Sequence, residues 1–276
     1  MEDSFPLSLC PTGMVPRRAD SPYIPISPAE IADQVAECSD LGVTSVHLHA
    51  RSGGGEPAWQ KDVFADIVSR IRRATPDLII CVTTSGRLES ALERRLDVLS
   101  LEGELKPDMA SLTLSSMNFA NSASVNSPET VKALASAMLD RGIVPELEIF
   151  DTGMVNYLHY LSGRGLLVEP YVVNFLLGGV ATAQATPLDL GMLVERLPDG
   201  AIWSAGGIGR AQLPATTMAL AAGGGVRIGL EDNLHLDSAR TRLATNKELV
   251  KRIVDIAHHL GRLPMRPHQM REILAR

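Results

Sequence analysis

Two stretches decide the fold: Thr44-Ser-Val-His-Leu-His49 and Leu78-Ile-Ile-Cys-Val-Thr83. The second is apolar at consecutive positions, which is typical of a strand that is buried on both faces of a parallel sheet. The first carries histidines at alternate positions, and side chains two apart on a strand point to the same side. A helix is predicted between the two stretches over Lys61–Ala74, so the chain here reads as strand, helix, strand.

The same order repeats on both sides of this unit. Further strands are predicted at Leu7–Cys10, Met109–Leu114, Val144–Phe150, Tyr171–Leu177, Ala201–Ser204 and Val226–Leu230. Further helices are predicted at Pro28–Leu41, Leu88–Leu99, Pro128–Arg141, Gly153–Gly163, Pro187–Leu197, Gln212–Ala222 and Asn246–Leu260. Eight strands alternating with helices indicate an α/β fold, a (β/α)8 TIM barrel, rather than a doubly wound sheet with a glycine-rich first turn. No linker interrupts the pattern, so residues 1–276 are predicted to form a single catalytic domain.

Length, charge and cysteine content restrict the class of protein. A chain of 276 residues buries a large core without a structural metal, so a metal site here would serve chemistry. The net charge of −6 and the pI near 5.7 argue against non-specific binding of nucleic acid or membrane surfaces. The three cysteines form no disulfide or zinc-finger pattern, and the start of the sequence lacks a signal-peptide pattern. We therefore expect a cytoplasmic protein.

The histidine pair is the centre of a predicted metal site. His47 and His49 end the second strand, on the side where the active sites of such barrels lie. Glu231 ends the predicted eighth strand, which is separated from the second strand only by the first. Two imidazoles and one carboxylate leave coordination positions open, as catalytic Zn²⁺ or another divalent metal requires. Hydrogen-bonded histidines and a solvated Glu231 are the alternative interpretation.

Two charged residues beside this set are candidates for catalysis. Asp232 follows Glu231 and is predicted to point elsewhere, either as a general base or as a cap of the next turn. Arg227 lies about one layer deeper, and a buried guanidinium needs a carboxylate or a developing oxyanion. Arg227 is therefore predicted either to stabilise charge in the reaction or to form a structural pair with Asp232, Glu146 or Glu148.

Polar groups that can contact a substrate close two neighbouring strands. Thr83, Ser85 and Gly86 end the third strand, and Ser111 lies on the fourth. Hydroxyls and backbone amides at these positions can donate to a substrate carboxylate, although they also fit ordinary turn chemistry.

A glycine-rich loop follows the seventh strand. The loops after strands seven and eight commonly bind phosphate in this fold, because glycines let backbone amides approach an anion. Gly207, Gly209 and Arg210 are therefore candidates for contacting a phosphate-bearing cofactor, although the motif alone is weak.

Two other classes of protein share part of this pattern. A metal-dependent hydrolase of the amidohydrolase type also begins with His-x-His in a barrel, but it needs further histidines on strands five and six. This sequence has Glu148, Asp151 and Asn174 in that region, so the hydrolase ranks second. A non-catalytic barrel that serves as a binding or structural module ranks third.

Seven motifs, in order over nearly the whole chain, resemble those of the beta-keto acid cleavage enzymes. They are Pro11-Thr-Gly13, Pro25-Ile-Ser-Pro-Ala-Glu-Ile31, Val46-His-Leu-His-Ala-Arg51, Thr83-Thr-Ser-Gly86, Pro145-Glu-Leu-Glu148, Ala205-Gly-Gly-Ile-Gly-Arg210 and Arg227-Ile-Gly-Leu-Glu-Asp-Asn233. The combination of His-x-His with Arg-x-x-x-Glu-Asp-Asn is specific, and on it the chain is identified as a member of this family.

The resemblance implies a (β/α)8 barrel, bound Zn²⁺, a homotetramer and a Claisen-type exchange. In that exchange a β-keto acid and acetyl-CoA, the co-substrate, give acetoacetate and a new CoA thioester. The positions that match the zinc ligands of the family are His47, His49 and Glu231. Asp232 matches the catalytic base and Arg227 the charge stabiliser. Thr83, Gly86 and Ser111 match substrate-contact positions, although many members have serine in place of Thr83.

One departure from the family concerns the tail of the substrate. Members that cleave 3-keto-5-aminohexanoate have a glutamate two residues after the glycine of the first loop, where this chain has Val15. A valine cannot pair with an ammonium group, so we expect a neutral or apolar tail. Arg17 and Arg18 nearby could instead favour an acidic one.

Overall fold

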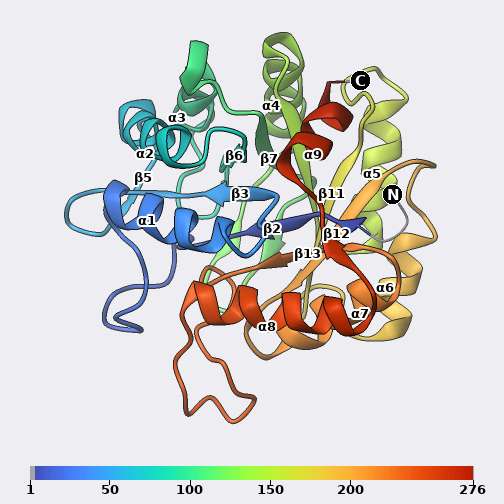
Figure 1. Ribbon diagram of the computed structural model, residues 1–276. Helices are drawn as coiled ribbons and strands as arrows, with labels where there is room; N and C mark the ends of the chain where they lie inside the picture. The colour runs from blue at the N-terminus through green and yellow to red at the C-terminus, as the bar shows by residue number, and fades with distance from the viewer. Residues whose placement is uncertain (1–3, 276) are drawn as a thin grey trace.

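The computed structural model, which describes residues 4–275, is a closed barrel of eight parallel strands surrounded by helices (Figure 1). The barrel strands are, in order, β2 (Leu7–Leu9), β3 (Ser45–Leu48), β6 (Ile79–Val82), β7 (Met109–Thr113), β10 (Val144–Ile149), β11 (Val172–Leu177), β12 (Ile202–Gly207) and β13 (Gly225–Ile228). Strand β13 pairs with β2 and closes the ring. The predicted (β/α)8 architecture is confirmed.

Helices connect and cover these strands. They are α1 (Pro28–Ser39), α2 (Lys61–Ala74), α3 (Leu92–Asp97), α4 (Pro128–Arg141), α5 (Thr152–Ser162), α6 (Pro187–Val194), α7 (Gln212–Ala221), α8 (Asn246–His259) and α9 (Pro267–Leu274), with short 3-10 turns at Val98–Ser100, Gly103–Leu105 and Gly209–Ala211. The predicted helix Leu88–Leu99 is too long at its start. Residues 83–91 instead form a loop at the mouth of the barrel, in which the Glu89 carboxylate accepts a hydrogen bond from the Ala91 amide.

Short strands add to both ends of the barrel. Strands β1 (Ser4–Phe5) and β14 (Leu263–Pro264) pair below it, at the N-terminal ends of the barrel strands. The hairpins β4–β5 (Ala50–Arg51 and Pro57–Ala58) and β8–β9 (Met117–Asn118 and Ala123–Ser124) lie in the loops of the opposite end. We call the end with the two hairpins the upper end, because it carries the predicted site residues.

The interior of the barrel has two layers of different chemistry. The lower layer is apolar and is closed by the C-terminal segment of the chain: Ile79, Cys81, Met109, Val172, Met265 and Met270. The layer above it is polar or charged and buried: His47, Ser111, Glu146, Glu148, Asn174 and Arg227. The alternate residues of the barrel strands, such as Val46, Leu48 and Leu147, point outward and pack against the helices.

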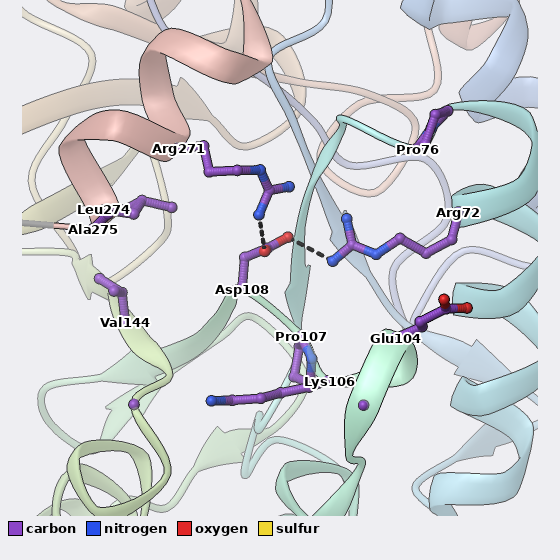
Figure 2. Close-up of a pocket in the computed structure, with 12 residues that line it drawn as sticks. Arg72, Pro76, Glu104, Lys106, Pro107, Asp108, Val144, Arg271, Leu274 and Ala275 are labelled. Atoms are coloured by element: carbon purple, nitrogen blue, oxygen red, sulfur yellow. Dashed lines mark hydrogen bonds and ion pairs between the residues drawn. The ribbon is translucent and has the colours of Figure 1, made fainter.

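The charged groups at the lower end are paired with one another. Asp108, just before β7, accepts hydrogen bonds from Arg72 of α2 at 2.8 Å and from Arg271 of α9 at 2.6 Å (Figure 2). Its carboxylate also accepts from the Ile80 amide at 2.8 Å. These groups line an open cavity of about 630 Å³. Together they fix the last helix beneath the barrel.

Within residues 4–275, no helix combines the length and the apolar character that crossing a membrane requires.

Candidate metal centre

The three predicted metal ligands meet at the upper end of the barrel. His47 is on β3, and His49 follows that strand by one residue. Their Nε2 atoms lie 3.3 Å apart, and His49 Nε2 lies 3.2 Å from Glu231 Oε1. One atom of each residue can be chosen so that all three lie within 4.8 Å of one another. Both histidines are almost completely buried, so the three donors form a single enclosed cluster.

A turn, and not the strand itself, carries Glu231 into this cluster. The predicted strand Val226–Leu230 is too long, because β13 ends at Ile228. Gly229 then adopts a φ of 150°, and a β-carbon there would lie 2.1 Å from the Cys10 carbonyl oxygen. The Glu231 amide donates to that same carbonyl at 3.1 Å. The end of the first barrel strand therefore positions Glu231, and only glycine fits at the start of the turn.

A second carboxylate sets the orientation of His47. Glu146 Oε2 lies 2.6 Å from His47 Nδ1, and Glu146 Oε1 accepts from the Asn174 amide at 3.1 Å. Burial alone lowers the pKa of His47, but the carboxylates of Glu146 and Glu231 outweigh it and raise that pKa to about 9. With Nδ1 held as a donor to Glu146, a neutral His47 has its lone pair on Nε2, the atom that faces His49.

The donor set fits a divalent cation. Glu231 Oε2 is buried and has no hydrogen-bond partner among the described residues, although Oε1 accepts from Arg227 at 2.7 Å. An unpaired buried carboxylate oxygen beside two imidazole nitrogens is costly unless a cation satisfies it. A second possible group, formed by His47, Cys81 and Glu146, is weaker, because the short contact between the imidazole and the carboxylate already occupies both.

Arg227 organises the carboxylates of the site from below. Its Nε donates to Asp232 Oδ2 at 2.9 Å, its Nη2 donates to Glu231, and its Nη1 lies 3.6 Å from Glu148 Oε1. Asp232 therefore turns back toward Arg227 and lines the same cavity as Glu231, whereas the sequence predicted that it points elsewhere. The tight turn after Gly229 brings both neighbouring carboxylates to one guanidinium.

The two adjacent carboxylates have opposite pKa shifts. Burial raises the pKa of both, but for Glu231 the charges of His49, Arg227 and His47 outweigh burial and hold its pKa well below the usual value. For Asp232 burial prevails over the attraction of Arg227, so its pKa is raised. A carboxylate that stays ionised thus stands beside one that takes up a proton more readily, which is the arrangement expected of a ligand next to a base.

A cavity of about 400 Å³ opens above these groups. Thr83 and Ser85 line it as predicted, whereas Gly86 and Ser111 do not. The Ser111 hydroxyl accepts from the Thr84 amide at 3.1 Å and so supports the loop from behind. Thr113, at the end of β7, lines the cavity and donates to Glu148 at 2.6 Å.

The predicted phosphate loop lies beside the cavity without lining it. A β-carbon on Gly207 would lie 2.4 Å from the Ala211 carbonyl oxygen, so that glycine is required by a close turn. Gly209 has a φ of +58°, and its amide donates to the Asp232 carbonyl at 2.7 Å. Arg210 is exposed. The loop therefore supports the backbone of Asp232.

One feature of the cavity walls was missed in the sequence. Arg87, directly after the Thr-Thr-Ser-Gly motif, lines the cavity and lies over the ring of Phe119. Its position next to a predicted substrate loop was the available signal. By contrast, Arg17 and Arg18 do not line the cavity, because Arg17 pairs with Asp20 and Arg18 with Glu30.

A smaller side pocket of about 270 Å³ adjoins the cavity and shares Met14, His49, Thr83 and Ser85 with it. Its remaining walls are mostly apolar and include Trp59. The histidine set of an amidohydrolase-type site is not formed, because β10 and β11 present Glu146, Glu148 and Asn174 at this level.

Comparison with known proteins gives a consistent result over nearly the full length of the chain. The family described as beta-keto acid cleavage enzyme matches residues 6–275. The 3-keto-5-aminohexanoate cleavage enzyme of Fusobacterium nucleatum is 34% identical over 92% of each chain. The 3-oxoadipate:acetyl-CoA acetyltransferase of Cupriavidus necator is 34% identical over 97% of this chain and 93% of its own.

Among solved structures, the ternary complex of ObcA with C4-CoA adduct and oxalate superposes with a TM-score of 0.82 at 22% identity. It covers 93% of this chain and 68% of that one, a likeness that concerns the fold alone. The sequence matches go further, because both the family match and relatives at 34% identity span nearly all of the chain. The chain belongs to the beta-keto acid cleavage enzyme family.

Proposed function

We propose that the protein transfers acyl groups between a β-keto acid and acetyl-CoA, giving acetoacetate and a new acyl-CoA. The observation that carries this proposal is the convergence of His47, His49 and Glu231 beside a buried Arg227–Asp232 pair. Family membership and the names of the relatives, three of which include acetyl-CoA, support the same reaction.

His47, His49 and Glu231 would hold a divalent metal, with Zn²⁺ the metal that suits two imidazoles and one carboxylate. When bound, such an ion polarises the carbonyl of the keto acid and acidifies the carbon between its carbonyl and carboxylate groups. Glu146 keeps His47 in the required tautomer through its contact with Nδ1.

Asp232 takes up the proton from that carbon. Its raised pKa makes the carboxylate a stronger base than an exposed aspartate, and Arg227 holds it at the cavity wall. Arg227 also lies close enough to share the negative charge of the resulting enolate. The Nη1 of Arg227 has no hydrogen-bond partner among residues 4–275, so it is free to donate to that charge.

The carbanion attacks the thioester carbonyl of acetyl-CoA and releases CoA as a thiolate. The thiolate then attacks the original keto carbon, and the bond between that carbon and the former carbanion breaks. Asp232 returns its proton to the departing carbon, which completes acetoacetate. The new thioester carries the rest of the keto acid, so atoms and charge balance without an oxidant or a reductant.

Thr83 and Ser85 donate hydroxyl hydrogen bonds to the carboxylate of the keto acid, and Gly86 and Ser111 hold their loop in place. Arg210, exposed at the rim, contacts the phosphates of CoA, and Gly207 and Gly209 shape the loop that carries it. The assembly that we propose is a homotetramer, which light scattering after size-exclusion chromatography can check.

A panel of β-keto acids with acetyl-CoA, followed through acetoacetate formation and metal content, tests the proposal. The wild type is expected to form both products in equal amounts. The Asp232→Asn variant is expected to keep its metal and lose turnover, because the amide cannot accept the proton. Full activity of that variant contradicts the assigned base, and absence of turnover with every acid in the wild type contradicts the reaction.

A further inference from the structure

One arginine on the wall of the cavity has no carboxylate partner in the part of the chain that the structure describes. Arg87 lines the same cavity as His49 and Glu231. Its guanidinium carbon lies 3.8 Å from the centre of the Phe119 ring, and its Nε makes only a long contact of 3.5 Å to the Ser122 hydroxyl. Among residues 4–275, no aspartate or glutamate oxygen lies within ion-pair distance of it.

The neighbouring arginines differ from Arg87 because their guanidinium groups have short hydrogen bonds to acceptors within the protein. Arg94, on the wall of the adjoining side pocket, binds Glu89 at 2.6 Å. Arg95, from the same pocket, donates to Asn126 at 2.7 Å and to a backbone carbonyl at the same distance. The hydrogen-bonding capacity of those guanidinium groups is used inside the protein. The charge of Arg87 is left for a ligand.

The surroundings of Arg87 fix its guanidinium before any ligand arrives. Phe119 holds one face of the group, and Phe119 itself packs edge-on against Phe150 with ring centres 6.0 Å apart. Stacking occupies the face and leaves the N–H edges available. Arg87 is only partly exposed, so an anion that pairs with it is less screened by water than at an open surface.

Arg87 is also near the reacting groups. Burial lowers the pKa of its guanidinium, and the charge of Glu231 acts in the opposite direction, so the two groups interact through space. An arginine remains charged at neutral pH under such conditions. An anion held by Arg87 would therefore sit within the cavity that contains the metal-binding cluster.

We propose that Arg87 binds a second carboxylate at the far end of the substrate, so that the preferred β-keto acid is dicarboxylic. The inference rests on the proposed function, in which the metal cluster, Thr83 and Ser85 take the β-keto acid end. Arg87, on another wall of the same cavity, is then left to contact the far end of the substrate. Val15, on the same cavity, adds no charge and can pack against the methylene groups between the two ends.

Two other sources of negative charge fit this position less well. The phosphates of CoA are separated from its thioester by the pantetheine arm, so a thioester placed at the metal cluster leaves them outside the cavity. The carboxylate next to the keto group already has Thr83 and Ser85 as donors. The side pocket with Trp59 could take an uncharged tail, but it offers no unpaired cation.

Three β-keto acids compared in one assay test the proposal: 3-oxoadipate, 3-oxohexanoate and 3-keto-5-aminohexanoate. The first two have the same six-carbon chain and differ in a terminal carboxylate against a methyl group. The wild type is expected to prefer the dicarboxylate, then the neutral acid, then the aminated acid. The Arg87→Met variant is expected to raise KM for 3-oxoadipate by roughly tenfold to a hundredfold and to leave 3-oxohexanoate little changed.

Two further variants separate recognition from general damage. Arg87→Lys restores the charge without the planar fork and is expected to recover part of the lost affinity. Arg17→Met removes an exposed arginine that pairs with Asp20 away from the cavity, and it is expected to leave both acids unaffected. Thermal unfolding of all three variants checks that the fold is retained.

An equal rise in KM for 3-oxoadipate and 3-oxohexanoate in Arg87→Met would overturn the proposal. It would mean that Arg87 binds the carboxylate next to the keto group, which both acids have. A rise confined to the KM of acetyl-CoA would overturn it in favour of a phosphate contact. Calorimetric binding of the two acids without acetyl-CoA decides the role of Arg87 even if turnover fails. A protein that binds 3-oxoadipate through Arg87 but makes no acetoacetate retains this inference and loses the proposed function.

Discussion

The two ends of the barrel both gather charged side chains, but they leave them in different states. At the lower end Asp108 has three hydrogen-bond donors, two of them guanidinium groups that also bond backbone carbonyls. At the upper end Arg227 Nη1 and Glu231 Oε2 belong to one cluster, are buried, and have no hydrogen-bond partner among residues 4–275. The lower end is electrostatically complete without a ligand. The upper end is complete only when something else binds.

The difference follows from what each end must do. Parallel strands bring their C-terminal ends and the following loops together, and loops can change without loss of the barrel. The lower end holds the C-terminal helix and seals the apolar layer around Met265 and Met270, so unmet polar groups there would only reduce stability. Unmet groups in the charged layer and just above it instead suit the proposed site for substrate and metal.

Loss of a metal ligand is expected to have the largest effect. His47→Ala removes one imidazole from the cluster and should lower kcat/KM by about a thousandfold or more, because metal polarisation supplies several kcal/mol. Metal content of the purified variant, measured by mass spectrometry, should fall with activity. His258→Ala, on the exposed face of α8, is the control and should change neither quantity.

An active, metal-free His47→Ala variant would remove the basis for treating the upper end as a metal centre. It would also bring back the alternative in which His47 and His49 are only a hydrogen-bonded pair. The comparison between the two ends would then rest on Arg227 and its carboxylates alone.

The architecture and the convergence of His47, His49 and Glu231 were predictable because both depend on local pattern. Continuous apolar runs such as 78–82 predicted parallel strands, and alternate positions placed His47 and His49 on one side of a strand. The barrel order then brought the last strand near the second. The helix predicted at Pro28–Leu41 was placed closely, because α1 begins at Pro28 with a capping box formed by Ser27 and Glu30.

What the sequence could not give depends on contacts between distant segments. The turn at Gly229 is set by the Cys10 carbonyl, which is more than 200 residues away in the chain. The alternation of side chains along the sequence carries no sign of this contact, so the predicted strand ran past Ile228, the true end of β13. The same turn brings the Asp232 carboxylate back to the Arg227 guanidinium. Arg87 could not be distinguished from the paired Arg94 and Arg95, because pairing is decided by side chains from other loops.

The second prediction concerns the group that orients His47. Glu146→Gln keeps the size of the side chain but removes the charge that fixes the His47 tautomer. Metal affinity is expected to fall by roughly tenfold to a hundredfold, with the metal still bound at saturation. Competition with a chelator measures the change, and Glu104→Gln at the lower end is the matched control. An unchanged affinity would show that the tautomer is fixed by other contacts.

The third prediction addresses the lower end. Asp108→Ala leaves the guanidinium groups of Arg72 and Arg271 and one backbone amide without their acceptor, which should cost about 1–3 kcal/mol of stability. Urea unfolding measures this cost, while kcat per bound metal should stay the same. The exposed pair Asp66–Arg70 supplies the control, because Asp66→Ala should cost less than about 1 kcal/mol. A large fall in kcat per bound metal in Asp108→Ala would mean that the two ends are not independent.

The smallest effect is expected from an exposed charge at the upper end. Burial raises the pKa of Glu30, but hydrogen bonds from the amides of Ser27 and Ile26 and the pairing with Arg18 together outweigh it and lower that pKa from 4.5 to about 2. A lowered folded-state pKa means that Glu30 stabilises the protein above pH 4.5 and loses that contribution as the pH falls toward 2. The Glu30 side chain is 43% exposed, so solvent screening keeps the contribution small. The difference in unfolding free energy between the wild type and Glu30→Gln should therefore shrink as urea titrations move from pH 6 to pH 3. If this difference in unfolding free energy instead grows on acidification, the pKa of Glu30 is raised in the folded protein and not lowered. Glu30 would then resemble the buried Asp232, whose pKa is raised.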